Sequence, residues 1–127
     1  MNYGLGAYKK TSINTARKEE ILLMLYEAAI KFCKKGIEAI KNKELAKKGE
    51  YIGKLQDIIM ELNNSLDHEV GGKMADELAS LYDFIFYSST QANINMDAKS
   101  LEDSLKVLLT LYEGWSTAIK SLKKGQK

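Results

Sequence analysis

The chain contains no proline, so it lacks the residue that most often stops a helix. It has one cysteine, Cys33, and therefore no disulfide can form within the chain. It also has one histidine, His68, too few for the cysteine and histidine clusters that hold structural zinc. These absences predict a helical protein of a reducing compartment, with no metal site and no cofactor.

The chain also lacks long apolar runs and a large excess of positive or negative charge. The longest apolar run, Ile21–Tyr26, is far too short to span a bilayer, and the N-terminus has no stretch that resembles a signal peptide. Nineteen Lys and Arg residues stand against 17 Asp and Glu residues, with both signs interleaved, so the chain has no electrostatic footprint for nucleic acid. We expect a cytoplasmic protein with no membrane insertion and no nucleic-acid partner.

What the chain does contain is apolar residues at helical spacing. Leucine, isoleucine and alanine recur every three or four residues in four stretches, within a length that suits one domain. The predicted helices run from about Lys18 to Asn42, from after Lys43-Glu44 to near Asp67, from Met74 to about Asn93 beyond the Gly71-Gly72 breaker, and onward from an N-cap at Asp97. Short joints force neighbouring helices to be antiparallel, so the fold class is all-α, an antiparallel up-down four-helix bundle with an N-terminal arm or cap.

The predicted arm or cap comprises residues 1–16, ahead of a bundle over residues 17–123 and a basic tail over residues 124–127. The arm contains two glycines and lacks helical periodicity. Its apolar side chains Tyr3, Tyr8 and Ile13 could lie over the bundle as a movable lid that a binding partner displaces. Equally, the terminus could contact nothing.

Several predicted helices carry a second, uncharged strip beside the core-facing stripe. The strip of the second helix comprises Ala46, Gly49, Gly53, Gln56, Met60 and Asn63. The strip of the fourth comprises Ser104, Val107, Leu111, Gly114 and Ala118, and on the first helix Leu23 and Met24 extend beyond the core stripe. One interpretation is that small residues at bundle corners let neighbouring helices approach. Because the pattern recurs on several helices, we favour a surface that binds segments of a client protein.

Short sequence segments spread along the chain also match a known family. They are Ala7-Tyr8-Lys9, Thr15-Ala16 ahead of Glu19-Glu20, Leu25-Tyr26 with Ala29-Ile30-Lys31-Phe32, Gln56-Asp57-Ile58-Ile59 with Glu61-Leu62, Leu66-Asp67 with Gly71-Gly72, Leu81-Tyr82-Asp83, Ala92-Asn93 and Trp115. In this order and spacing they make the chain resemble the flagellar secretion chaperone FliS family.

The resemblance implies a non-enzyme with an N-terminal cap segment. Its implied client is the C-terminal region of flagellin, which the family binds in the cytoplasm, keeps from assembling prematurely and presents for export. A contact with the flagellar export gate is a further implication. The chain departs from the family pattern at Arg17-Lys18, where Ser-Pro is common, and at Tyr87-Ser88-Ser89, where arginines are common.

Two other functions can be weighed against this one. His68 in a four-helix bundle suggests a histidine phosphotransfer domain, but such a histidine belongs in mid-helix and His68 precedes a double-glycine break. Cys33 lies on the core-facing stripe with no catalytic partner, which suggests a buried apolar role. A self-associating structural bundle is the remaining alternative.

Overall fold

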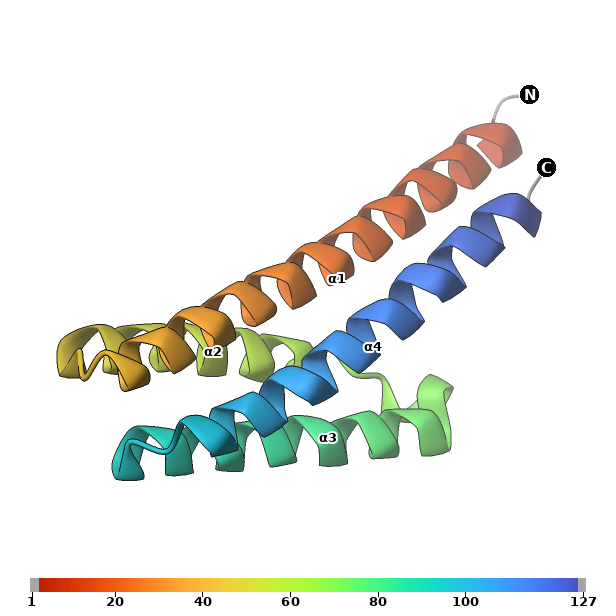
Figure 1. The fold of residues 1–127 in the computed structure, drawn as a ribbon. Helices are drawn as coiled ribbons and strands as arrows, with labels where there is room; N and C mark the ends of the chain where they lie inside the picture. Colours follow the sequence, from red (N-terminus) through yellow and green to blue (C-terminus); the bar gives the residue numbers. More distant parts are fainter. Residues whose placement is uncertain (1–2, 126–127) are drawn as a thin grey trace.

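The protein was analysed as a computed structural model that describes the backbone of residues 3–125 and the side chains of residues 15 and 17–124. Within that range it forms four α-helices: α1 (Tyr3–Lys41), α2 (Leu45–Asn64), α3 (His68–Asn95) and α4 (Ala98–Gly125). Figure 1 shows these helices with the N- and C-termini at the same end of the molecule. The predicted all-α class is confirmed.

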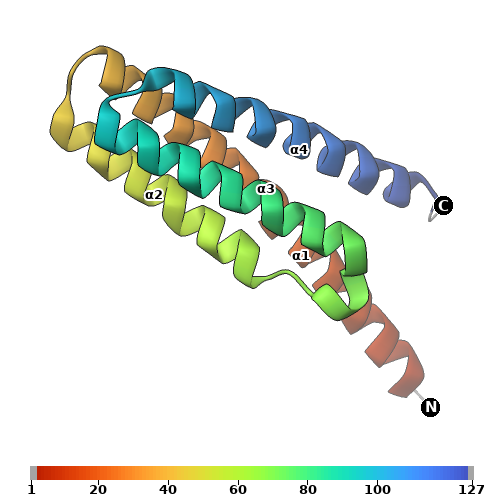
Figure 2. The same cartoon turned by 90° about the horizontal axis from the view of Figure 1, so that it is seen from below.

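The helices form an antiparallel up-down bundle. Each packs against its neighbours in the chain, and α1 also packs against α4, which closes the ring. Figure 2 shows the α1–α2 and α3–α4 connections together at one end and the α2–α3 connection at the other. The short joints give this topology because each returns the chain along the helix it has just left.

The core lies along the axis of the ring and takes residues from every helix. Its buried apolar residues include Ala29, Cys33 and Ile40 of α1, Ile52, Leu55 and Ile59 of α2, Leu78, Ile85 and Ala92 of α3, and Leu101 and Leu108 of α4. These are largely the positions that recur at spacings of three and four in the sequence. Their burial supplies most of the stability, since isolated helices of this length are marginal in water.

The first turns of α3 and α4 are each capped by an aspartate side chain. Asp97 Oδ1 accepts hydrogen bonds from the backbone N–H groups of Lys99 at 3.0 Å and Ser100 at 3.4 Å, which confirms the predicted N-cap of α4. The side chain of Asp67 caps α3 in the same way, by accepting from the N–H groups of Glu69 and Val70. Both carboxylates satisfy amides that have no partner within their helix.

The predicted start of the first helix at about Lys18 is wrong, because α1 already begins at Tyr3. Extending an existing helix gains one hydrogen bond per residue, and without proline nothing in this segment blocks that extension. Gly4 and Gly6 cost only about 1 kcal/mol each relative to alanine. The division into an arm over residues 1–16 and a bundle over residues 17–123 stays a prediction, and the described part of α4 runs past Lys124 to Gly125.

The double glycine interrupts α3 rather than preceding it. The helix was predicted to begin at about Met74, whereas it begins at His68 and changes direction at Gly72, whose φ of 52° and ψ of −127° are not helical. Only glycine adopts such angles without strain. Gly71 has a different role, because a Cβ there would lie 2.9 Å from the Cβ of Ala75.

Because α2 is much shorter than α1, one end of the bundle lacks a full set of four helices. At 1.5 Å per residue the 39 residues of α1 extend about 58 Å and the 20 residues of α2 about 30 Å. Figure 2 shows the N-terminal part of α1 continuing past the α2–α3 connection. Apolar residues of α1 and α4 near this end therefore lack a complete set of helical neighbours.

Candidate client-binding surfaces

The uncharged strip of α2 stays accessible to solvent. Met60 is 51% exposed. Asn63 is also exposed, and Gly49 and Gly53 are half-buried. A Cβ built on either glycine would meet no described atom within 4 Å, so the chain itself does not supply the close backbone approach that could justify these residues. This part of the strip is open to a partner.

Gln56, in the middle of the same strip, contacts the neighbouring helix. Its Nε2 donates to Ser89 Oγ at 3.0 Å and to Thr90 Oγ1 at 2.9 Å, both on α3. Ser89 is buried, and its own hydroxyl donates to the carbonyl of Phe86. For Gln56 the geometry therefore favours the bundle-corner interpretation over direct client contact.

Charged residues of α2 gather on its other flank, toward α1. Lys54 pairs with Glu50 at 3.1 Å, and its Nζ also lies 5.4 Å from the centre of the Phe32 ring of α1. Lys35 of α1 lies in the same way over the ring of Tyr51. These contacts place this charge at the α1–α2 corner. On the α3 side, near the start of α2, Lys48 Nζ donates to the carbonyl of Asn93 at 2.7 Å.

The strip of α4 borders a small surface pocket shared with α3. Val107 and Leu111 line this pocket of about 240 Å³ together with Leu81 of α3. Both residues are half-buried against the core, and Gly114 is exposed. Ser104, which was expected on this strip, is fully buried, and that prediction is wrong because α4 turns this position toward its neighbours.

On α1, Leu23 and Met24 extend the apolar surface beyond the core-facing stripe, as expected. Met24 is 65% exposed and Leu23 is half-buried. The side chains of Tyr3, Tyr8 and Ile13 lie outside the described part, so their contact with this surface stays a prediction. None of the ten candidate residues with a described side chain is fully buried.

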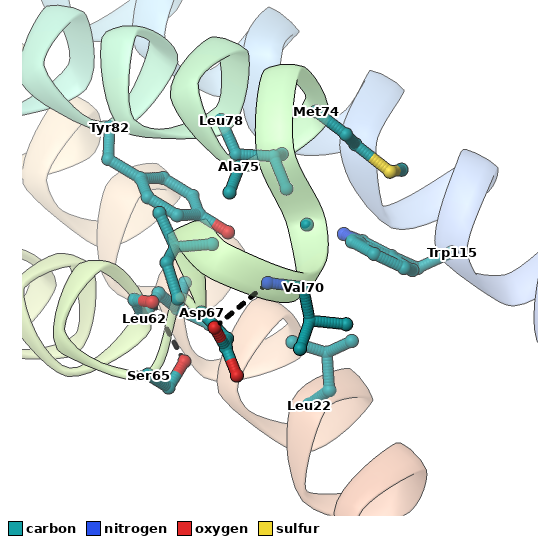
Figure 3. A pocket seen from close by; sticks show the side chains of 12 residues that line it. Leu22, Leu62, Ser65, Asp67, Val70, Met74, Ala75, Leu78, Tyr82 and Trp115 are labelled. Carbon is teal, nitrogen blue, oxygen red and sulfur yellow. Dashed lines mark hydrogen bonds between the residues drawn. The ribbon is translucent and has the colours of Figure 1, made fainter.

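A larger apolar cavity, not predicted from the sequence, lies at the incomplete end of the bundle. It has a volume of about 320 Å³ and a largely apolar lining. Its lining residues are Leu22, Leu62, Ser65, Leu66, Asp67, Val70, Gly71, Met74, Ala75, Leu78, Tyr82 and Trp115. Figure 3 shows Leu22 of α1, Val70 of α3 and Trp115 of α4 around it. The double glycine is the sequence feature that marks this end of the bundle. The second helix ends at Asn64, before its predicted end near Asp67.

Three aromatic residues form a polar cluster beside this cavity. The hydroxyls of Tyr26 and Tyr82 share a hydrogen bond of 2.5 Å, and Trp115 Nε1 donates to Tyr26 Oη at 3.3 Å. Burial raises the pKa of both tyrosines above the ordinary value, because the interior disfavours the charged phenolate. The cluster links α1, α3 and α4 across the bundle.

The two side chains weighed as reactive groups, His68 and Cys33, do not have the surroundings that catalysis requires. His68 is the first residue of α3 and is exposed, with its Nδ1 2.8 Å from Asp76 Oδ1, which is unlike the mid-helix histidine of a phosphotransfer domain. Cys33 is buried as predicted, and burial raises the pKa of its thiol to about 12. Among residues with described side chains no group of three metal-binding residues occurs, and no described helix combines the length and apolarity to cross a membrane.

The structure defines the class as an all-α antiparallel four-helix bundle, with accessible uncharged strips and an open apolar cavity. Sequence comparison gives the family. Residues 1–122 match the sequence model of the family described as flagellar protein FliS. The chain belongs to the FliS family, a family of non-enzymatic chaperones, as the resemblance implied.

Individual relatives agree with this assignment. The flagellar secretion chaperone FliS of Bacillus subtilis is 33% identical over 118 residues, which cover 93% of this chain and 87% of that protein. The Vibrio cholerae protein of the same name is 35% identical over 119 residues, or 91% of this chain and 88% of that protein. A crystal structure of a flagellar chaperone from bacteria superposes with a TM-score of 0.75 at 24% identity, covering 82% of this chain and 85% of that one, and supports the fold.

The structure also locates the two departures from the family pattern. Arg17 and Lys18 are exposed on α1, within the helix rather than at its start. Tyr87 is exposed, whereas Ser88 and Ser89 are buried. Since Ser89 accepts the amide of Gln56, small polar residues in this segment support the contact between α2 and α3.

Proposed function

We propose that this chain is a cytoplasmic export chaperone that binds the C-terminal region of flagellin. In this role it prevents premature polymerisation and presents flagellin to the export apparatus, with the export gate as a second partner. Membership of the FliS family supports a flagellar export client, and the motifs that resemble the family imply flagellin as that client. The notion that residues 1–16 cover the client surface is part of the same proposal.

The observation that carries the proposal is that three helices retain uncharged surface that the bundle does not bury. Met24, Met60 and Gly114 are exposed on α1, α2 and α4. A client segment that folds as an amphipathic helix gains by covering such surface, and flexible methionine side chains adapt to its shape. Once covered, the apolar face of the client is no longer available to another flagellin molecule.

Calorimetric titration of the chain with a flagellin C-terminal segment tests this function. Binding at micromolar concentration or tighter is expected, and Met60→Glu should weaken it about tenfold or more, because a carboxylate would be buried against apolar client residues. Met60 is half-exposed, so the circular dichroism spectrum and melting temperature of the variant should stay close to those of the wild type.

Ile94→Glu is the matched control, because Ile94 is an exposed apolar residue of α3, outside the three strips, and its substitution adds the same charge. It should leave affinity unchanged. If the wild-type chain does not bind, the proposed client is wrong. If Met60→Glu unfolds the bundle, Met60 is a core residue rather than a contact.

A further inference from the structure

The turn Asp67–Gly72 lies at the mouth of the apolar cavity. Val70, within the turn, is 86% exposed, although it is an apolar side chain beside an apolar space. Figure 3 places Val70 next to Leu22 and Trp115, which form two walls of that space. An exposed valine and an unfilled cavity side by side leave apolar surface in water on both.

The backbone of the turn has a natural pivot. Gly72 has a φ of 52° and a ψ of −127°, so it breaks the helical path between the turn and the rest of α3. Glycine has access to several other conformations at similar energy. Gly71 lets the turn lie against Ala75, where any side chain would collide. Rotation at Gly72, together with a change in the Ser65–Leu66 connection to α2, can move the turn without unfolding the helix that follows.

Local hydrogen bonds hold the turn together as a unit. Asp67 Oδ1 accepts from the N–H groups of Glu69 and Val70, each at 3.1 Å, and the carbonyl of Asp67 accepts from Gly71 N at 2.8 Å. A polar contact that crosses the pivot joins His68 to Asp76, both exposed. Exposed pairs of this kind contribute little to stability, so the pair does not prevent movement.

We propose that Asp67–Gly72 is a strap that rotates about Gly72 and inserts the side chain of Val70 into the cavity between Leu22 and Trp115. In the closed state the protein covers this apolar surface with a residue of its own. Removal of the valine and the cavity walls from water drives closure, and the conformational freedom of the open strap opposes it. If the proposed function holds, a client side chain that enters the cavity competes with Val70.

Methyl NMR can observe the strap directly, because Val70 and Val107 are the two valines of the chain. With valine methyl groups labelled, relaxation dispersion should show microsecond-to-millisecond exchange at Val70, with a shift caused by the ring of Trp115. Val107 lines the separate pocket between α3 and α4 and should show none. A flat profile for Val70 with the shifts of a water-exposed valine would overturn the proposal.

A pair of substitutions gives an independent readout. Val70→Thr keeps the shape of the side chain but would bury a hydroxyl without a partner in the closed state, so it should hold the strap open. Acrylamide quenching of Trp115, the one tryptophan, should then increase, whereas the control Val107→Thr should match the wild type. Equal quenching in all three proteins would contradict the strap.

Both measurements use the free protein, so they are independent of the client. Failure to bind flagellin with normal exchange at Val70 would reject the proposed function alone. Normal binding with a rigid, exposed Val70 would reject the strap alone.

Discussion

Tyr26 is the residue on which the polar cluster of the bundle depends. Its hydroxyl is hydrogen-bonded to Tyr82 and accepts from Trp115, and each partner comes from a different helix. This arrangement cannot be predicted from the sequence, since Tyr26, Tyr82 and Trp115 all fit the apolar spacing of their helices equally well. Helical periodicity identifies a residue as interior but does not say which residue it faces across the core.

The cluster predicts unequal costs for removal of its two hydroxyls. Tyr26→Phe should lower the free energy of unfolding by about 2 kcal/mol, because both the Tyr82 hydroxyl and the Trp115 N–H lose their partner. Tyr82→Phe should cost about 1 kcal/mol, because Tyr26 still accepts from Trp115. Urea unfolding followed by circular dichroism measures both values. A greater cost for Tyr82→Phe would contradict the hydrogen-bond arrangement.

Cys33 illustrates a residue whose role was predicted from its position on the core stripe. It is fully buried, and its Sγ donates to the carbonyl of Leu101 at 3.3 Å. Burial raises its thiol pKa to about 12, so very little thiolate is present at pH 8. Since the thiolate is the reactive form, the folded protein should resist alkylation.

Iodoacetamide labelling at pH 8, followed by mass spectrometry, tests this expectation. Labelling should be very slow in buffer and should reach the rate of a free cysteine in concentrated urea. Equal rates in the two conditions would show that Cys33 is accessible in the native state.

At the scale of elements, Gly36 of α1 and Gly53 of α2 differ in how closely a neighbouring helix approaches them. A Cβ on Gly36 would lie 2.9 Å from Cδ2 of the buried Leu101 and 3.4 Å from Cγ1 of Ile52. A Cβ on Gly53 would meet nothing within 4 Å. In the sequence Gly36 falls on the core-facing stripe with Cys33 and Ile40, and Gly53 falls on the uncharged strip, but spacing alone does not say how closely a neighbouring helix approaches either one.

Alanine at these two positions should have opposite effects. Gly53→Ala should stabilise the protein by about 1 kcal/mol through helix propensity. Gly36→Ala should destabilise it by about 1–3 kcal/mol, since the fully buried Leu101 would have to shift within the core to make room for the added methyl group. Thermal and urea unfolding of the two variants provide the comparison. Stabilisation by Gly36→Ala would show that α1 and α4 pack less closely than the structure indicates.

The extent of each helix was predictable where the sequence carries a local signal. Asp97 marks the start of α4 because its carboxylate caps free amides, and the pattern of α2 is clear up to Leu62. The start of α1 was missed because residues 3–16 lack apolar periodicity, while propagation from the periodic part needs none. The kink at Gly72 was recognised as a breaker, but the turn preceding it was not recognised as helical.

At the scale of the whole molecule, the fold followed from the sequence but the cavity did not. Four apolar stripes and short joints specify an antiparallel bundle almost completely. The cavity depends on how far each helix extends past its neighbours and on the direction of the turn at Gly72, which are tertiary properties. Such features have no periodic signature in the chain.

The candidate client residues, whose role stays a prediction, differ in how accessible the bundle leaves them. Met24, Met60 and Gly114 are accessible, as a binding surface requires, whereas Gln56 is used within the bundle. Residues at helix corners and residues that face a client have the same sequence pattern. The structure separates them because it shows which side chains already have partners.

Methionine oxidation tests most directly the central claim that a client lies on the accessible uncharged strips. Met24 and Met60 are both more than half exposed and belong to different helices. With mild peroxide and mass spectrometry, their oxidation rates should fall in proportion to the fraction of chain bound when a flagellin C-terminal segment is added. Unchanged rates at both methionines under saturating segment would contradict the claim, because the client would then bind elsewhere on the bundle.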